Sequence, residues 1–254
     1  MDPYTFSAIA HATHRFHNPI SLDKLESVLS LLDLGPDDRL VDFGCGNAEM
    51  LAMLLARSGA TGLGVDRSPR AIEAARQNAA GRVPVDRLTL IEGDARAAAA
   101  DASGYALALH VGGPALQDPP GIRANLGTLA RVVRPGGFVL AGEGYWRREP
   151  ETAYLEALGA TRDEMLDHAG NVAAGEAAGL IPWHAVTAST DEWDDYEWRY
   201  GRSIEAYALD QPDDPDVPAM LARIRAWRRT YLTAGRDTLG FGLYLFRRPA
   251  TMWP

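Results

Sequence analysis

Carboxylates, glycines and a histidine follow four short apolar runs in the first half of the chain. Asp42 comes just before the glycine turn Gly44-Cys45-Gly46, and Asp66 stands 20 residues beyond Gly46. Glycines let a ligand approach the backbone, and a carboxylate at that offset is placed to accept hydrogen bonds from ribose hydroxyls. Asp94 and His110 follow the next two runs. The spacing predicts a site for a nucleoside-like ligand.

The elements that position these residues are strands alternating with helices. We expect strands at 39–43, 61–65, 87–91, 105–110 and 136–141, and helices at 21–32, 47–58, 69–80 and 121–133. Ser21 and Ser68 are placed to cap two of these helices, and Pro69 suits a first helical position. The alternation predicts an α/β fold with a mainly parallel sheet and helices on both faces. Ligands of such sheets lie outside the carboxyl ends of the strands, where the four candidate positions meet.

The second half of the chain is helical and aromatic, over roughly 151–178 and 192–232. Two strand-like pieces, 180–188 and 239–247, are expected to close the sheet as a hairpin. We therefore expect a single domain over 1–254. It would have a core at about 20–145, an N-terminal lid at 1–20, and a helical cap with closing strands at 146–254.

Composition narrows the class of protein. The chain has 254 residues, a net charge of −9 and one cysteine, Cys45. The negative charge argues against a nucleic-acid partner, and one cysteine excludes an internal disulfide and a cysteine-based zinc site. A basic leader followed by an apolar run is not present at the start, and no stretch has the roughly 20 apolar residues that span a bilayer. We expect a cytoplasmic monomer or homodimer with no membrane partner.

The motifs together resemble the class I S-adenosylmethionine-dependent methyltransferases. The resemblance rests on Val41-Asp42-Phe43-Gly44-Cys45-Gly46, Asp66, Asp94 and the turn Arg134-Pro135-Gly136-Gly137, and it covers about residues 20–145. It implies a Rossmann-like seven-stranded sheet with a reversed last strand, and S-adenosyl-L-methionine as cofactor. The segments 14–19, 142–147 and 240–242 are similar to those of one bacterial subgroup taken to methylate small molecules. That subgroup implies no particular substrate.

The resemblance assigns roles to residues around the glycine turn. Asp66 would bind the ribose, Asp94 the adenine edge, and Asp42 the amino group through water or backbone. The cofactor-binding set is completed by its neighbours, Gly44, Cys45, Gly46, Arg67, Ala95 and His110. Each carboxylate also has a structural alternative to its cofactor role. Asp42 can cap the strand end or keep it in contact with water, Asp66 can cap a helix, and Asp94 can be an ordinary turn residue. Cys45 is interpreted as a small residue tolerated in the turn.

Histidines are the natural base candidates near neutral pH. His110 ends the fourth strand, so it is expected to reach the cleft, either as a catalytic group or as a structural one that bonds to backbone. His11, His14 and His17 recur every three residues and would share a helix face. A metal trio is disfavoured because no cysteine or acidic partner is near. We expect this segment to be a lid, with His14 and His17 as candidates to act on substrate or cofactor.

The acceptor is expected to be a small molecule. In the family, a run of an acidic residue or asparagine, two prolines and an aromatic after the fourth strand marks nucleic-acid and protein-amide N-methylation. This chain has 110–114 as His-Val-Gly-Gly-Pro instead. Tyr145 and Trp146 would wall a flat or cationic substrate, and Glu143 would be a base or pair with an arginine. Most of the aromatic cluster Trp193, Tyr196, Trp198 and Tyr200 is expected to be core, with some chance of lining the pocket.

Two alternatives to a methyltransferase stay open on sequence alone. An NAD(P)-dependent reductase would place a third glycine three residues after Gly46, where this chain has Glu49. A carboxylate there suits a pyrophosphate badly. A non-catalytic domain that binds the nucleoside as a sensor or structural subunit is the second alternative, since no residue is identified with certainty as an acceptor-site base.

Overall fold

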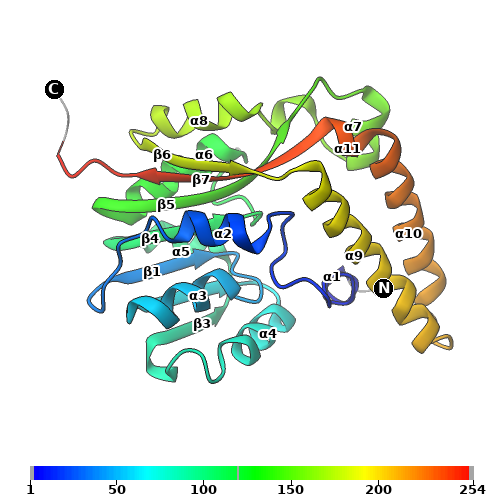
Figure 1. Cartoon of the computed structure of the whole chain (residues 1–254), viewed down its shortest axis with the longest axis horizontal. Helices are drawn as coiled ribbons and strands as arrows, with labels where there is room; N and C mark the ends of the chain where they lie inside the picture. Colours follow the sequence, from blue (N-terminus) through cyan, green and yellow to red (C-terminus); the bar gives the residue numbers. More distant parts are fainter. Residues whose placement is uncertain (1–2, 119, 252–254) are drawn as a thin grey trace.

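The computed structural model describes residues 3–118 and 120–251 (Figure 1). The first two residues of the predicted lid and 252–254 of the closing region lie outside that part. The strands are β1 (Arg39–Phe43), β2 (Thr61–Asp66), β3 (Leu88–Glu92), β4 (Tyr105–Val111), β5 (Val133–Trp146), β6 (Ile181–Thr187) and β7 (Leu239–Arg247). The α-helices are α1 (Pro3–Ala10), α2 (Leu22–Leu29), α3 (Glu49–Ser58), α4 (Pro69–Ala79), α5 (Ala95–Asp101), α6 (Ile122–Val132), α7 (Thr152–Leu158), α8 (His168–Ala177), α9 (Thr190–Asp210), α10 (Val217–Thr230) and α11 (Arg236–Thr238). Short 3₁₀ turns occupy Val85–Arg87 and Arg162–Glu164, and a π-helical turn occupies Tyr231–Gly235.

Within the described residues, seven strands form one sheet in the order β3-β2-β1-β4-β5-β7-β6. The pairs among β1 to β5 are parallel, and β7 is antiparallel to both of its neighbours, β5 and β6. This confirms the Rossmann-like sheet with a reversed last strand. The closing strands do pair, but they are not a hairpin, because α9, α10 and α11 lie between them in the chain.

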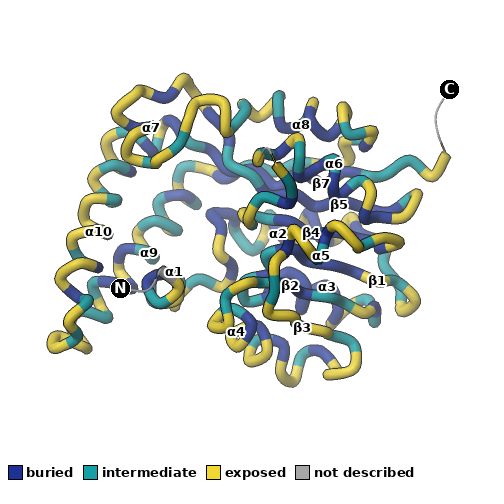
Figure 2. The backbone as a smooth tube through the Cα atoms, turned by 180° about the vertical axis from the view of Figure 1, so that it is seen from behind, coloured by how far each residue is buried: buried dark blue, intermediate teal, exposed yellow. Residues whose placement is uncertain are grey.

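Helices cover both faces of the sheet, and the strand residues alternate between two cores. Leu40 and Leu107 pack with α2, α3 and α4, whereas Val41 and Ala108 pack with α5, α6 and α8. Figure 2 shows the central strands buried and the outer sides of the helices exposed. Ser21 and Ser68 accept hydrogen bonds from the nitrogens of Lys24 and Ala71, so both predicted caps are confirmed.

The helical additions differ in detail from the sequence prediction. The region 151–178 contains two helices, α7 and α8, and 192–232 is broken between α9 and α10 by 211–216, which contains Pro215. The predicted turn at 134–137 is an irregularity inside β5, where the register with β4 shifts. Beyond it β5 continues to Trp146, because β7 supplies backbone partners along its whole second half.

A third, smaller core lies beside one end of the sheet, where α1, α9 and α10 pack together (Figure 1). Phe6 and Ala10 of α1 are buried against Ile204 of α9 and against Met220 and Ile224 of α10. The N-terminal segment therefore belongs to the packing of the helical additions. No helix in the described ranges is long and apolar enough to cross a membrane.

Candidate active site

The glycine turn joins β1 to α3 at the carboxyl edge of the sheet. Gly44 and Gly46 have φ values of +79° and +54°, which lie in the region that glycine adopts without strain. A Cβ added at Gly44 would lie 3.0 Å from Pro114 Cδ and 3.1 Å from Gly113 Cα. The turn after β1 and the turn after β4 therefore approach each other closely, and the positive φ together with these tight contacts favours glycine at position 44.

Asp66 fastens this turn to the end of β2. One carboxylate oxygen accepts a hydrogen bond from the Gly46 nitrogen at 2.9 Å, and the other accepts one from the Ser68 nitrogen at 2.9 Å. Each oxygen keeps a further lone pair that can accept from a ligand hydroxyl. Since Ser68 caps α4 itself, Asp66 is not needed as the cap.

Asp42 is buried under the same turn, with 2% of its surface exposed. Burial, and then the negative charge of Asp66, raise the pKa of Asp42 to about 7. Its Oδ2 atom has no hydrogen-bond partner within the described part of the chain. A buried oxygen without a donor is costly, so this position suits a ligand that brings a positive or hydrogen-bonding group.

Cys45, between the two glycines, is also buried, and burial followed by the charge of Asp42 raises the pKa of its thiol. The thiol therefore stays protonated, and nothing marks it as a nucleophile.

Asp94 begins α5 at the end of β3. Its Oδ1 atom accepts hydrogen bonds from the Arg96 and Ala97 nitrogens at 2.7 and 3.2 Å, and these bonds lower its pKa. Its Oδ2 atom lies 3.3 Å from Arg67 Nη2, and Ala95 is buried behind it. The residue thus caps a helix and is not the ordinary turn residue of the plainer alternative, while Oδ2 stays exposed beside Arg67 at the edge where an adenine is predicted.

A cavity of about 360 Å³ lies between the glycine turn, the turn after β4 and the N-terminal segment. Its walls include Gly44, Cys45, Gly46, Asn47, Asp66 and 111–114 on the sheet side, and Ser7, His11, Phe16, His17, Asn18 and Tyr196 on the other. The structure therefore brings together the predicted turn, Asp66 and His17 around one space. The N-terminal segment covers that space.

The three N-terminal histidines lie in the turns after α1, which ends at Ala10, so the predicted shared helix face is wrong. Their rings nevertheless gather: His11 stacks on His17 with 4.3 Å between centroids, and His14 lies 5.1 Å from His11. Burial lowers the pKa of all three imidazoles, to about 3 for His11 and about 4 for His17. They are neutral at pH 7. Residues 3–118 and 120–251 contain no group of three His, Cys, Asp or Glu side chains arranged to hold a metal.

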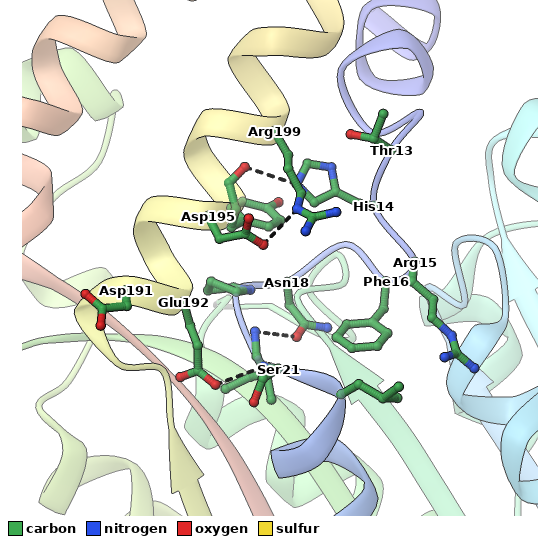
Figure 3. A pocket seen from close by; sticks show the side chains of 14 residues that line it. Thr13, His14, Arg15, Phe16, Asn18, Ser21, Asp191, Glu192, Asp195 and Arg199 are labelled. Carbon is green, nitrogen blue, oxygen red and sulfur yellow. Dashed lines mark hydrogen bonds and ion pairs between the residues drawn. The ribbon is translucent and has the colours of Figure 1, made fainter.

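The segment after α1 is fastened to α9 along a second cavity of about 350 Å³ (Figure 3). His14 Nε2 lies 3.0 Å from the Tyr196 carbonyl oxygen, which fixes this nitrogen as the donor. Glu192 accepts a hydrogen bond from the Ser21 nitrogen at 3.1 Å and pairs with Lys24 at 2.5 Å. These bonds hold the N-terminal segment between the sheet and the added helices.

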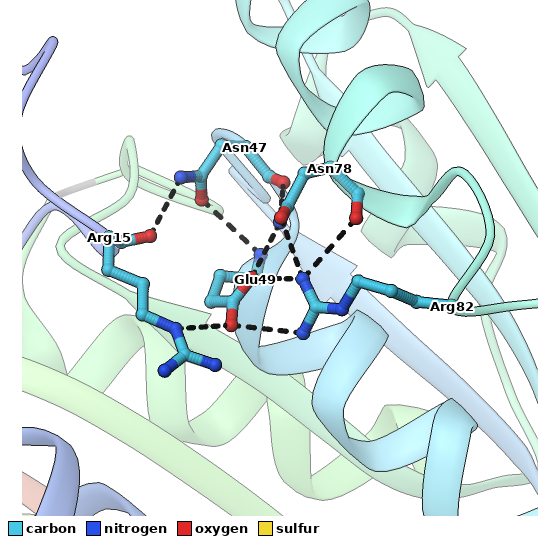
Figure 4. A network of polar contacts seen from close by, with 5 residues as sticks. All are labelled: Arg15, Asn47, Glu49, Asn78 and Arg82. Atoms are coloured by element: carbon cyan, nitrogen blue, oxygen red, sulfur yellow. Dashed lines mark hydrogen bonds and ion pairs between the residues drawn. The ribbon is translucent and has the colours of Figure 1, made fainter.

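Glu49 holds the same segment from the other side (Figure 4). Its side chain is only 2% exposed and accepts from Arg15 Nε at 2.7 Å, Asn78 Nδ2 at 2.7 Å and Arg82 Nη2 at 3.0 Å. These hydrogen bonds and the charge of Arg82 outweigh burial and lower the pKa of Glu49. The Asn47 side chain also donates to the Arg15 carbonyl oxygen at 2.8 Å. Glu49 therefore ties the segment to α3 and α4.

His110 does not reach the cleft, and that expectation is wrong. The side chain is 3% exposed; its Nδ1 lies 2.8 Å from the Phe43 carbonyl oxygen and its Nε2 3.2 Å from Asn125 Nδ2. Asn125 Oδ1 in turn accepts from the Leu116 nitrogen. The imidazole thus bridges the ends of β1 and β4 to α6, which matches the structural alternative.

Glu143, Tyr145 and Trp146 lie in the extension of β5, away from both cavities described above. The Tyr145 ring packs on Gly240 and lies 5.5 Å from the His168 ring, and Trp146 Nε1 donates to the Arg162 carbonyl oxygen at 2.9 Å. Burial raises the pKa of Glu143 to about 7. The geometry does not bring these side chains to the glycine turn, because β7 pairs with β5 there and encloses them.

Sequence reasoning missed a third cavity of about 750 Å³ among α1, α7, α9 and α10. Trp193, Tyr196 and Tyr200 of α9 line it together with Trp227 of α10. The signal was present, because positions 193, 196 and 200 follow the i, i+3, i+7 spacing of one helix face. Trp198 lies off that face and is 53% exposed. His11 and Tyr196 line both this cavity and the one at the glycine turn.

Comparison with known proteins agrees with this geometry. Residues 40–137 match a family model described as a methyltransferase domain. The structure is similar to an S-adenosylmethionine-dependent methyltransferase from Thiobacillus denitrificans solved with S-adenosyl-L-homocysteine: the TM-score is 0.85 at 29% identity, covering 97% of this chain and 99% of that one.

Two further relatives are informative. The Escherichia coli protein YjhP, described as uncharacterized, is 28% identical over 246 residues, covering 96% of this chain and 98% of YjhP, and its crystal structure has a TM-score of 0.83. An indolepyruvate C-methyltransferase from Streptomyces griseus is 38% identical over 79 residues, which is 30% of this chain and 24% of that protein.

Proposed function

Because the chain belongs to the class I S-adenosylmethionine-dependent methyltransferases, close to the bacterial YjhP-like proteins, we propose that it methylates a small-molecule acceptor. The observation that carries the proposal is the cavity between the glycine turn and the N-terminal segment, with Asp66 in its wall. Beneath the turn lies an Asp42 oxygen that has no hydrogen-bond partner among the described residues. Bound S-adenosylmethionine would supply an electrophilic methyl group on a positively charged sulfur.

The residues of the turn fit this cofactor. Asp66 would accept hydrogen bonds from the ribose hydroxyls, and Gly44 and Gly46 leave room for the methionine part against the backbone. Asp42 would lose its proton when a cationic amino group arrives, because a positive charge lowers the pKa that burial has raised. Asp94, with Arg67 and Ala95 beside it, would meet the adenine edge.

The N-terminal segment would exclude water and orient the acceptor. Phe16 and His17 cover the cavity, and Glu49 and α9 hold the segment in place. A neutral His17 can accept a hydrogen bond from a polar acceptor group, whereas His14 is committed through Nε2 to the Tyr196 carbonyl. His110 acts as a positioning residue that keeps the turns after β1 and β4 in contact.

Enclosure favours a small acceptor over a macromolecule. The cavity lies under the N-terminal segment, and the partial relative from Streptomyces griseus is named for indolepyruvate, a small molecule. Residues 110–114 also lack the run that marks nucleic-acid and protein-amide methylation in the family.

Calorimetry with S-adenosylmethionine, S-adenosylhomocysteine and NADP tests the cofactor directly. We expect the first two to bind and NADP not to bind. Selective binding of NADP would contradict the proposal and support the reductase alternative. Methyl turnover on a panel of small metabolites then separates an enzyme from a non-catalytic binding domain, since a sensor would bind the nucleoside without consuming it.

A further inference from the structure

The aromatic cavity among α1, α7, α9 and α10 shares part of its wall with the predicted cofactor cavity. His11 and Tyr196 line both spaces, so a ligand in the larger one would lie next to the cofactor cavity. Its volume of about 750 Å³ is within the range of small-molecule sites. None of the residues assigned to the cofactor lines it.

Aromatic side chains form much of the wall of this cavity. Trp193, Tyr196 and Tyr200 line it from α9, Phe6 from α1, and Trp227 from α10. Tyr196 and Tyr200 are stacked, with ring centroids 6.3 Å apart. Such faces bind apolar and flat groups, and they attract cations through the negative potential of the ring.

One carboxylate, that of Glu197, stands among these rings. Its Oε2 atom accepts a hydrogen bond from Trp227 Nε1 at 2.7 Å. No ion pair to Glu197 is found in the part of the chain that the structure describes, although most of its acidic neighbours on α9 have one. Burial raises the pKa of Glu197 to about 7. A cation that enters the cavity would therefore stabilise the ionised carboxylate.

Arg223, the other charged group in the lining, has a different setting. Its guanidinium lies 4.1 Å from the centroid of the Phe6 ring, on an exposed part of α10. Arg223 is thus exposed and already stacked on one wall ring, whereas Glu197 is half-buried and bonded only to Trp227 among the described residues. Glu197 is therefore the group in the lining that is placed to bind a cation.

We propose that this cavity is the acceptor site and that it selects compounds carrying a basic nitrogen on an apolar or aromatic body. Glu197 binds the ammonium group, the rings hold the body, and His11 and Tyr196 mark the end nearest the methyl donor. The inference rests on the proposed methyltransferase function, which supplies the reason for an acceptor beside the glycine turn.

The test uses the full chain saturated with S-adenosylhomocysteine and three probes of similar size: phenethylamine, 2-phenylethanol and 3-phenylpropionate. Calorimetry should show phenethylamine binding at least tenfold more tightly than the other two. Glu197→Gln should weaken phenethylamine about tenfold and leave 2-phenylethanol within about twofold.

Glu205→Gln is the matched control, because it removes a carboxylate from the same helix outside the cavity. It should leave all three affinities unchanged.

The outcomes separate the two proposals. If S-adenosylhomocysteine itself does not bind, the proposed function fails. If it binds but 3-phenylpropionate matches or exceeds phenethylamine, or no probe binds, or Glu197→Gln leaves amine affinity unchanged, only the acceptor inference is overturned. Should Glu197→Gln not fold, the comparison of the three probes on the unaltered chain still decides the charge preference.

Discussion

Replacing Asp66 with asparagine separates its structural role from its predicted ribose role. In the folded chain its two oxygens accept from the Gly46 and Ser68 nitrogens, both at 2.9 Å. Asparagine offers one carbonyl oxygen, so one of these N–H groups would face an NH₂ group. An unsatisfied partly buried donor costs about 1–3 kcal/mol, and we expect the free energy of unfolding to fall by that amount.

The expected loss in cofactor affinity follows from charge. Hydrogen bonds to an ionised acceptor are roughly twice as strong as neutral ones. The substitution should therefore remove about 1–2 kcal/mol from the binding free energy that the two ribose hydroxyls contribute together. Since about 1.4 kcal/mol is a factor of ten, S-adenosylhomocysteine should bind about 5- to 30-fold more weakly. Calorimetry measures this affinity, and urea unfolding measures the stability separately.

Asp38→Asn is the control. Asp38 also holds a backbone nitrogen, that of Gly35 at 2.9 Å, and pairs with Arg134 at 2.7 Å, but it precedes β1 at the opposite edge of the sheet. It should lower stability without changing affinity. The ribose assignment is refuted if folded Asp66→Asn protein binds S-adenosylhomocysteine as tightly as the unaltered chain, or if both variants weaken binding equally.

Two further predictions concern stability. Arg82→Met should lower the free energy of unfolding in urea by about 2–3 kcal/mol, because it strips the main partner from the buried Glu49 carboxylate; Arg15→Met, whose side chain is 53% exposed, should cost less than about 1 kcal/mol. Equal losses would contradict this ranking. Glu192 has its pKa lowered from 4.5 to about 2 by Lys24 and Ser21, despite burial, so its contribution is complete above about pH 5 and disappears as pH falls towards 2. The stability gap between Glu192→Gln and the unaltered chain, measured from pH 7 to pH 2, should therefore close; a gap independent of pH would show that the charge is not the cause.

Local sequence was enough to predict the strand, turn and helix at the proposed cofactor edge. The β1 strand, the glycine turn and α3 are contiguous, and the caps Ser21 and Ser68 act within three residues. Asp66 followed from a fixed offset along one βαβ unit. In each case the partners are close in sequence or set by the parallel sheet, so type and spacing determine the geometry.

Where a residue's partners come from distant segments, the sequence predicted its position in the sheet but not the direction of its side chain. His110 does stand near the end of β4, yet its ring turns inward because the Phe43 carbonyl and Asn125 satisfy both nitrogens. Tyr145 and Trp146 follow the predicted strand, but pairing with β7 prolongs β5 and encloses them. Neither partner can be read from the residues beside these positions.

The proposed cofactor site depends mainly on local contacts, whereas the proposed acceptor site depends on contacts between distant segments. The proposed cofactor edge is built by one short stretch and its neighbours in the sheet, where a side chain at Gly44 would be strained by its positive φ and by tight contacts. The aromatic cavity is built by α1, α9 and α10, which bring Phe6, Glu197 and Trp227 together from opposite ends of the chain. Substitutions in these helices can alter the lining without moving the glycine turn. With the acceptor in the proposed aromatic cavity, acceptor preference can diverge among proteins that share the same glycine turn, and Glu197 is then the position whose substitution tests it.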